Sequence, residues 1–232
     1  MSTAALAKPE VDRATSSDAG VALKSLDAAK VRPVMPLAPG DCGPVETPRQ
    51  PRTFRVTRPA YHKMNEVGVF AGRRVELIDG RIVEMPPMGP EHRRSLIKSS
   101  VVFSTRFNTD ETFVLCQVPT ILEQSEPEPD LSVHQGHPDT GGDDLADTLL
   151  VVEISKTSLN LDRTVKLRLY AAAPYAEYWI VDLDHRRLIV HRDPTGDDGL
   201  EHYTDVTEHA DDAEVAPLFA PEKRVKVADL LP

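Results

Sequence analysis

The sequence predicts an α/β (α+β) fold with a mixed central β-sheet flanked by helices, and three observations lead to it. Residues Leu149–Ser155 are apolar and mostly β-branched, which is typical of a strand buried on both faces. Residues Glu91–Asn108 place apolar side chains roughly on one side of a helix. A helix from Asn160 to about Ala173 and a strand at Glu177–Asp182 follow, so helices and strands alternate along the chain.

Length and composition allow one domain and a tail, or two small domains. The chain has 232 residues and 40% hydrophobic content, enough for a core but below average. Residues 1–52 are rich in Ala and Pro without a regular period, so we expect a disordered tail, with a short helix at Val21–Val31 as an alternative. Residues 53–232 form the expected folded domain. We expect no secretory signal and no membrane span, and the two cysteines, Cys42 and Cys116, suit reduced thiols in the cytoplasm.

The formal net charge of −10 argues against a broad electrostatic grip on nucleic acid. Many of the acidic residues lie between Asp193 and Pro232, whereas positive and negative charges are closer to balance between Arg52 and Arg192. Most of the basic residues in the balanced part are expected to be solvated surface.

The first half of the domain contains a helix, a hairpin, a helix and a strand. Thr57–Gly68 has a helical start with Pro59 in the first turn. Val75–Met85 consists of two alternating strands around Asp79-Gly80, a strong hairpin signal. The helix Glu91–Asn108 should form an apolar face, with Leu96, Ile97, Val101, Phe103 and Phe107 roughly on one side. The strand should cover Phe113–Leu122, with a bulge or an edge at Pro119.

The second half contains the central strand and its neighbours. Asp130–Val133 reads as a short strand before Leu149–Ser155. In the helix from Asn160, we expect Leu161, Val165, Leu169 and Ala172 to face the core, with Asp162, Lys166 and Tyr170 on an adjoining face. Glu177–Asp182 should pair with Arg187–His191 through a tight turn. An acidic segment, a strand at Arg224–Val227 and a turn at Ala228–Leu231 complete the chain.

A carboxylate inside a buried strand needs a partner, because an unpaired buried charge is very unfavourable. Glu153 is either paired with a nearby Arg or Lys, or the strand end opens into a cleft. Asp130 begins one strand and Glu153 ends the next, so both carboxylates could meet at one edge of the sheet. They would repel each other unless a cation lay between them, and Mg²⁺ usually takes one or two carboxylates plus water and phosphate. Lys166 on the following helix could stabilise negative charge developing on phosphorus.

These motifs resemble a known family. Pro129-Asp130 followed by Glu153-Ile154-Ser155 is similar to the PD-(D/E)XK nuclease signature. The run GRRVELIDGRIVEMPP, then His92, PDLSV, VVEIS, the helix with Lys166 and Tyr170, and AEYWIVD resembles the Uma family of restriction-endonuclease-like proteins. The resemblance covers about Tyr61 to His191 and depends on the order and spacing of the motifs together. It implies a restriction-endonuclease-like core.

The resemblance also implies roles. Asp130 and Glu153 would bind Mg²⁺ (or Mn²⁺), with the Ile154 carbonyl as a further ligand. Ser155 stands where the superfamily usually has its lysine, and Lys166 matches the helix lysine of this family. Lys156 is a weaker substitute, because its side chain should leave the strand opposite to Ser155. Glu76 would add an acidic group near the metal, and His92 matches a helix histidine near the cleft.

Structural interpretations stay open beside these roles. Asp162 could simply pair with Lys166 along the helix. Glu76 could be a solvated hairpin residue, and His92 a structural or capping residue. His134 and His137 with Asp139 form an alternative metal site without a recognised ligand spacing. Tyr178-Trp179 favours core packing over base stacking.

The resulting functional hypothesis is a metal-dependent endonuclease that hydrolyses phosphodiester bonds of DNA, with Glu76, Asp130, Glu153 and Lys166 as the catalytic set. The alternative is a catalytically inactive nuclease-like module that binds nucleic acid or a protein partner, and an inactive remnant of a toxin or transposon is a further one. A homodimer would suit the cutting of both strands of a duplex.

Overall fold

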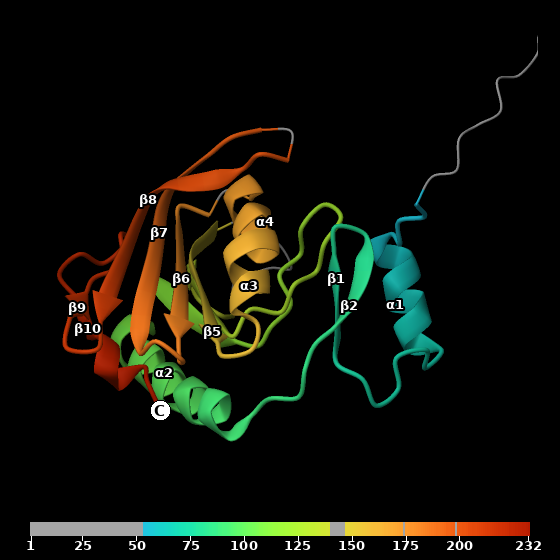
Figure 1. Ribbon diagram of the computed structural model, residues 1–232. Helices are drawn as coiled ribbons and strands as arrows, with labels where there is room; N and C mark the ends of the chain where they lie inside the picture. The colour runs from blue at the N-terminus through green and yellow to red at the C-terminus, as the bar shows by residue number, and fades with distance from the viewer. Residues whose placement is uncertain (1–52, 140–146, 174, 198) are drawn as a thin grey trace, which may run out of the picture. The chain divides into compact units, whose positions relative to one another are not determined.

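The computed structural model describes residues 53–139, 147–173, 175–197 and 199–232. The expected tail and its short helix at Val21–Val31 lie outside these residues. The described residues form a mixed sheet with helices on both faces, and the elements can be followed in Figure 1. The predicted α/β (α+β) fold with a mixed central sheet is therefore confirmed.

Six strands form the central sheet in the order β3-β4-β5-β6-β7-β8. Only the neighbours β5 and β6 are parallel within the described sheet, and the chain connects them through the helical segment that begins at Leu159. The other pairs are antiparallel. The strands are β3 (Thr112–Cys116), β4 (Leu131–Gln135), β5 (Thr148–Ser155), β6 (Glu177–Asp182), β7 (Arg187–Thr195) and β8 (His202–Ala210).

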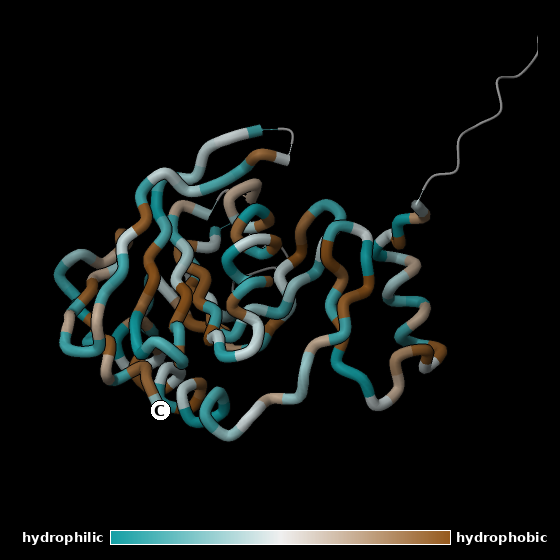
Figure 2. The backbone as a smooth tube through the Cα atoms, viewed as in Figure 1, coloured by the Kyte–Doolittle hydropathy of each residue, from teal (hydrophilic) through white to brown (hydrophobic). Residues whose placement is uncertain are grey.

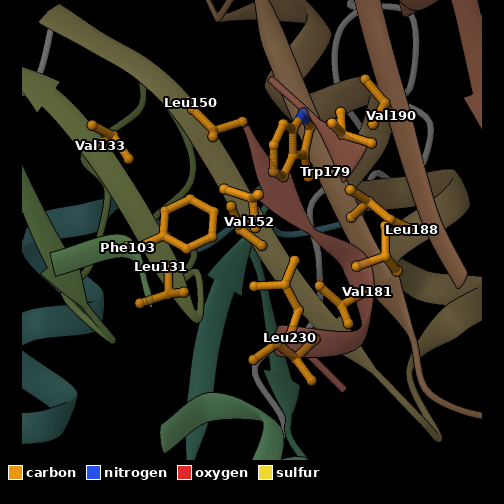
Figure 3. Close-up of a cluster of buried hydrophobic side chains, with 14 of the residues drawn as sticks. Phe103, Leu131, Val133, Leu150, Val152, Trp179, Val181, Leu188, Val190 and Leu230 are labelled. Carbon is orange, nitrogen blue, oxygen red and sulfur yellow. The ribbon is translucent and has the colours of Figure 1, made fainter. Parts of the chain in front are cut away.

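Alternate residues of β5 serve two different cores. Leu150, Val152 and Ile154 lie in the larger core, beneath helix α2 (Pro90–Phe107). Figure 3 shows Phe103 of this helix beside the side chains of β4 and β5. The opposite face carries Val151, which belongs to a second buried group, here called the tyrosine-rich cluster: Val151, Tyr170, Tyr175, Tyr178, Ile180, Ile189 and Tyr203. Glu153 lies two residues after Val151 in the strand, so its side chain is on the same face as Val151. This face is covered by the helical segment and is opposite to α2.

The hairpin forms its own two-stranded sheet, β1 (Val75–Ile78) with β2 (Arg81–Glu84). Its turn residues Asp79 and Gly80 both have positive φ, at 49° and 66°, as a type I′ turn requires. An isolated bridge between Leu77 and Glu126 ties the hairpin to the loop before β4. Helix α1 (Arg58–Glu66) begins at an N-cap, Thr57, that accepts a hydrogen bond from the Ala60 amide.

Two expectations for the first half are wrong. In α2, Leu96, Phe103 and Phe107 are buried, but Ile97 and Val101 are 58% and 61% exposed because the core contacts only one narrow stripe of the helix. Strand β3 ends at Cys116 and not at Leu122. Gln117 adopts a left-handed φ of 52°, and Pro119 has no amide to donate, so the ladder cannot continue.

The helical segment after β5 differs from the expected amphipathic helix. It consists of α3 (Leu159–Leu161), a π-helical turn η3 (Asp162–Lys166) and α4 (Leu167–Ala172). Its buried side chains are polar, namely Asp162, Lys166 and Tyr170. Val165, expected in the core, is 41% exposed. The inward face of this segment is therefore largely polar, and its contacts with the tyrosine-rich cluster come from Tyr170 and from partly buried side chains such as Leu167.

The acidic segment near the C-terminus was not predicted to form structure, but it contains the edge strand β8. Its register with β7 begins with Thr195 opposite His202 and ends with Arg187 opposite Ala210. Beyond it, β9 (Glu214–Val215) pairs with β10 (Val225–Lys226), and the 3₁₀ turn η4 (Val227–Asp229) follows. Leu230 and Leu231 then enter the larger core, so the C-terminus covers the same face as α2.

Hydrophobic residues concentrate along the central strands, whereas α1 is mostly hydrophilic (Figure 2). Among the described residues, there is no helix with the length and apolar character that a membrane crossing needs.

His191 of β7 gives a pH prediction. Burial lowers the pKa of this histidine from 6.5 to about 4, and its ring stacks on Tyr178 with centroids 5.4 Å apart. Because the folded-state pKa lies below the unfolded value, stability is lost as the pH falls from 6.5 towards 4. Relative to the wild type, His191→Phe should gain about 2 kcal/mol between pH 7.5 and pH 5, measured by urea unfolding. A parallel loss in both proteins would show that the histidine does not titrate in this way.

Candidate active site

The predicted carboxylates meet at the ends of two neighbouring strands. Leu131 of β4 pairs with Val152 of β5, so one further step of the same register places Asp130 opposite Glu153. Residues directly opposite in an antiparallel pair share a face of the sheet. Both side chains line a cavity of about 370 Å³, which Glu76, His92, Asp162 and Lys166 also line. The structure therefore brings together the four candidate catalytic residues Glu76, Asp130, Glu153 and Lys166.

Asp130 is held by three donors from different parts of the chain. The Ile154 amide donates to its Oδ2 at 2.8 Å, and the Gln117 side-chain amide donates to Oδ1 at 3.2 Å. His92 Nε2 lies 3.0 Å from Oδ2, and the His92 side chain comes from the first turn of α2. Gln117 ends β3 with a left-handed backbone conformation, and its backbone N–H donates to the backbone carbonyl of Asp130 at 3.2 Å. These contacts fix one orientation of the carboxylate.

Glu153 accepts two hydrogen bonds from the helical segment. Lys166 Nζ and the Tyr170 hydroxyl each donate to Oε1, both at 2.8 Å. Lys166 Nζ also lies 3.3 Å from Oε2 of Glu76, so one ammonium group contacts carboxylates from the hairpin and from the sheet. The Lys166 side chain is only 2% exposed, which makes this a buried ionic cluster.

Carboxyl groups outnumber the ammonium group in this cluster, and their pKa values reflect it. Burial raises the pKa of Glu153 to about 8, against the opposing effect of Lys166. Burial also raises the pKa of Glu76 and of Asp162, although Lys166 lowers both. Burial alone would lower the pKa of Lys166, but Glu153 and Glu76 raise it above its ordinary value. The ammonium group therefore stays charged, and the carboxyl groups of the cluster hold protons more readily than exposed carboxyl groups do.

The residues fit a hard divalent cation by the chemistry of their donors. Glu76 is 1% exposed, and neither of its oxygens accepts a hydrogen bond of good geometry from the described residues. A buried carboxylate in this condition is stabilised by added positive charge. No group of three or more His, Cys, Asp or Glu side chains that could hold a metal ion occurs in the described ranges. Mg²⁺ usually takes only one or two protein carboxylates, so Asp130 and Glu153 suffice as a pair.

Several contacts were not predicted from the sequence. Gln117 lies in a loop, and no motif indicates that it reaches Asp130. Ser158 Oγ donates to Asp162 Oδ2 at 2.7 Å. Ser155 stands at the usual lysine position, and its Oγ lies 3.3 Å from Ser158 Oγ. Lys156 pairs with Glu91 and lies 3.7 Å from Asp184, although it also lines the cavity. The spacing of Asp162 and Lys166 suggested a simple pair, whereas the nearest partner of Lys166 is Glu153.

The alternative metal site at His134 is not assembled by the described residues. His134 is buried, with Nε2 2.8 Å from Ser132 Oγ and Nδ1 3.2 Å from Thr148 Oγ1. Burial lowers its pKa to about 4, which keeps the ring neutral. His137 Nδ1 instead lies 3.5 Å from the Asp139 carboxylate at an exposed position. His134 therefore has a structural role in β4.

The mixed sheet, with paired carboxylates at adjoining strand ends and a buried lysine, defines a protein with a restriction-endonuclease-like fold. The family model described as "Uma2: Putative restriction endonuclease" matches residues 58–227, and the chain belongs to this family. The resemblance seen in the sequence motifs is therefore confirmed.

A comparison with a solved structure supports the fold. That structure is the crystal structure of "a putative nuclease belonging to DUF820" from Anabaena variabilis ATCC 29413, with a TM-score of 0.51 and 20% sequence identity. The match covers 68% of this chain and 89% of that chain. At this identity the likeness shows the fold alone. Among curated proteins, none matches the chain.

Proposed function

We propose that this protein is a metal-dependent endonuclease that hydrolyses phosphodiester bonds of DNA. The observation that carries the proposal is the cavity in which Asp130, Glu153, Glu76 and Lys166 converge from the sheet, the hairpin and the helical segment. Membership of the restriction-endonuclease family supports the same reaction class. Hard oxygen donors beside one buried ammonium suit a reaction that concentrates negative charge on phosphorus.

Asp130 and Glu153 would hold Mg²⁺ or Mn²⁺. When bound, the ion supplies a water of lowered pKa and neutralises charge on the scissile phosphate. Lys166 stabilises the negative charge that develops on the phosphate oxygens. The water oxygen forms a bond to phosphorus as the bond from phosphorus to the sugar oxygen breaks, and the leaving sugar oxygen takes a proton from solvent water. Glu76, whose pKa is raised by burial, is the carboxyl group assigned to accept the proton that the water loses.

His92 and Gln117 are assigned to orient Asp130. Their contacts at 3.0 and 3.2 Å, together with the Ile154 amide, hold the carboxylate in one orientation. Ligand orientation of this kind is a regular feature of metal sites.

The substrate contacts are expected to be few, because the chain has a net charge of −10. Arg74 and Lys156 line the cavity and are 34% and 39% exposed, so they are the cations placed to contact the flanking phosphates. We further propose a homodimer, since cleavage of both strands of a duplex favours two-fold pairing of sites. The cysteine usage supports a cytoplasmic location.

Plasmid cleavage with Mg²⁺ or Mn²⁺ tests the proposal. The wild type should nick or linearise the plasmid, and Asp130→Ala and Glu153→Ala should lower the rate by about 10²-fold or more. Asp205→Ala, an exposed acid of β8, is the matched control and should keep full activity. Equal activity in all four proteins would assign the cleavage to a contaminant and reject the nuclease.

A second candidate is a catalytically inactive module with the nuclease-like fold that binds nucleic acid or a protein. It is favoured by the net charge of −10, by Ser155 at the usual lysine position and by the ion pair that Lys166 makes with Glu153. Calorimetric titration with Mn²⁺ separates the two candidates. A heat of binding that disappears in Glu153→Ala supports the nuclease, whereas no such heat in the wild type supports the module.

A further inference from the structure

Tyr170 contacts the Glu153 carboxylate in a way that the proposed chemistry does not use. Its hydroxyl and Lys166 Nζ both donate to Oε1, so among the described residues both hydrogen bonds to Glu153 end on one oxygen. The arrangement leaves Oε2 available to a ligand in the cavity that Glu153 lines. A carboxylate with one oxygen held by two donors cannot rotate freely about its last bond.

Packing holds the Tyr170 ring in position. The side chain is fully buried, and its ring centroid lies 5.0 Å from that of Tyr178 and 6.0 Å from that of Tyr175. These rings belong to the tyrosine-rich cluster on the face of the sheet to which Glu153 points. The packed rings therefore hold the Tyr170 hydroxyl in a fixed position. A fixed partner of this kind can orient a neighbouring metal ligand accurately.

The π-helical turn explains why Asp162, Lys166 and Tyr170 all reach this face. In an α-helix, the residue four positions along lies slightly past one full turn, because a turn takes 3.6 residues. The wider π turn, with its i→i+5 hydrogen bonds, needs more than four residues. From Asp162 to Lys166 the chain follows the π turn, so Lys166 falls short of a full turn from Asp162. From Lys166 to Tyr170 the chain runs into the α-helix, so Tyr170 lies past a full turn from Lys166. The two differences in direction offset each other, and the three side chains share a face. The Tyr178 hydroxyl donates to the Asp162 carbonyl at 3.3 Å, inside this turn.

We propose that Tyr170 is a positioning residue, which orients Glu153 so that Oε2 faces the divalent cation. The inference rests on the proposed function, since it concerns the same metal ligand. Tyr170 itself touches neither the cation nor the phosphate. Its hydroxyl acts through Glu153 alone, and the expected consequence of removing it is a weaker metal site in a protein that still folds.

The experiment is calorimetric titration of Mn²⁺ into the wild type, Tyr170→Phe, Tyr203→Phe and Glu153→Ala. Tyr203→Phe is the matched control, because its hydroxyl is buried in the same cluster but donates to the Tyr175 carbonyl, at 3.1 Å. Tyr170→Phe should bind Mn²⁺ about 10- to 100-fold more weakly, as expected for loss of an orienting partner, and Tyr203→Phe should bind like the wild type. Thermal unfolding without metal should show similar Tm values for the two Phe variants, because each loses one buried hydroxyl.

The outcomes are distinguishable. Equal Mn²⁺ affinity in Tyr170→Phe and the wild type, with binding lost in Glu153→Ala, would overturn the positioning role and leave the metal site intact. Equal weakening in both Phe variants, with equally lowered Tm values, would assign the effect to the aromatic packing and also overturn it. Absence of Glu153-dependent binding in the wild type would overturn the metal site and this inference together.

Discussion

Glu153→Gln is expected to abolish nucleic-acid cleavage and, in the metal-free protein, to raise the free energy of unfolding at pH 7. The amide keeps the shape of the side chain and still accepts from Lys166 and Tyr170 at its oxygen. It loses the charge that a hard cation requires, so the rate should fall by about 10³-fold. Stability should rise, because burial raises the pKa of this carboxyl from 4.5 to about 8 and its ionised form is disfavoured on folding.

The sign follows from proton linkage. A group whose folded-state pKa is raised gives stability at low pH that is lost as the pH rises from 4.5 to about 8. The stability of the wild type minus that of Glu153→Gln should therefore fall across this window, and at pH 7 the variant should be more stable by about 1–3 kcal/mol. Urea unfolding at several pH values measures the difference. Glu214→Gln, an exposed acid of β9, should show no such slope, and a destabilised Glu153→Gln would contradict the raised pKa.

The elements that could be predicted are those in which local pattern and tertiary role agree. Strand β6 begins and ends where the apolar run Glu177–Asp182 predicts. The Asp79-Gly80 turn forms because both residues tolerate the positive φ that the hairpin demands. Strand β8 was missed because it is an edge strand with charged, exposed residues and one deeply buried side chain, Tyr203, so no alternation is visible.

The helical segment shows why the site was only partly predictable. Periodicity assumes that apolar side chains point inwards, but here Lys166 is buried and Val165 is exposed. The carboxylates of Glu153 and Glu76 stabilise the buried ammonium, and these partners are distant in the sequence. The strand register that places Asp130 opposite Glu153 could be anticipated from the order of the motifs. The contact from Gln117 could not, because it depends on a left-handed turn after β3.

Lys166→Met should have the opposite effect on stability, and the effect should be large. The ammonium group contacts Glu153 at 2.8 Å and Glu76 at 3.3 Å, and its removal leaves buried carboxylates without a cation. Loss of one partner from a buried ionic group typically costs about 3–5 kcal/mol. We expect a loss of this size in urea unfolding at pH 8, which lies well above the ordinary pKa of both carboxyl groups. At pH 5 the loss should be smaller, because Glu153 and Glu76, whose pKa values are raised, can take up protons.

Lys156→Met is the matched control, because Lys156 lines the same cavity but is 39% exposed and pairs with the part-exposed Glu91. It should lose no more than about 1 kcal/mol.

Excess Mn²⁺ should restore part of the stability of Lys166→Met, about 2.7 kcal/mol at 100 times the dissociation constant, because the cation binds the folded carboxylates. In the proposed reaction Lys166 also stabilises the charge on phosphorus, so cleavage should stay about 10²-fold slower even when Mn²⁺ has restored the fold. If Lys166→Met is as stable as the wild type at pH 8, the carboxyl groups are neutral without the lysine, and Lys166 is not the counter-ion that holds the site together.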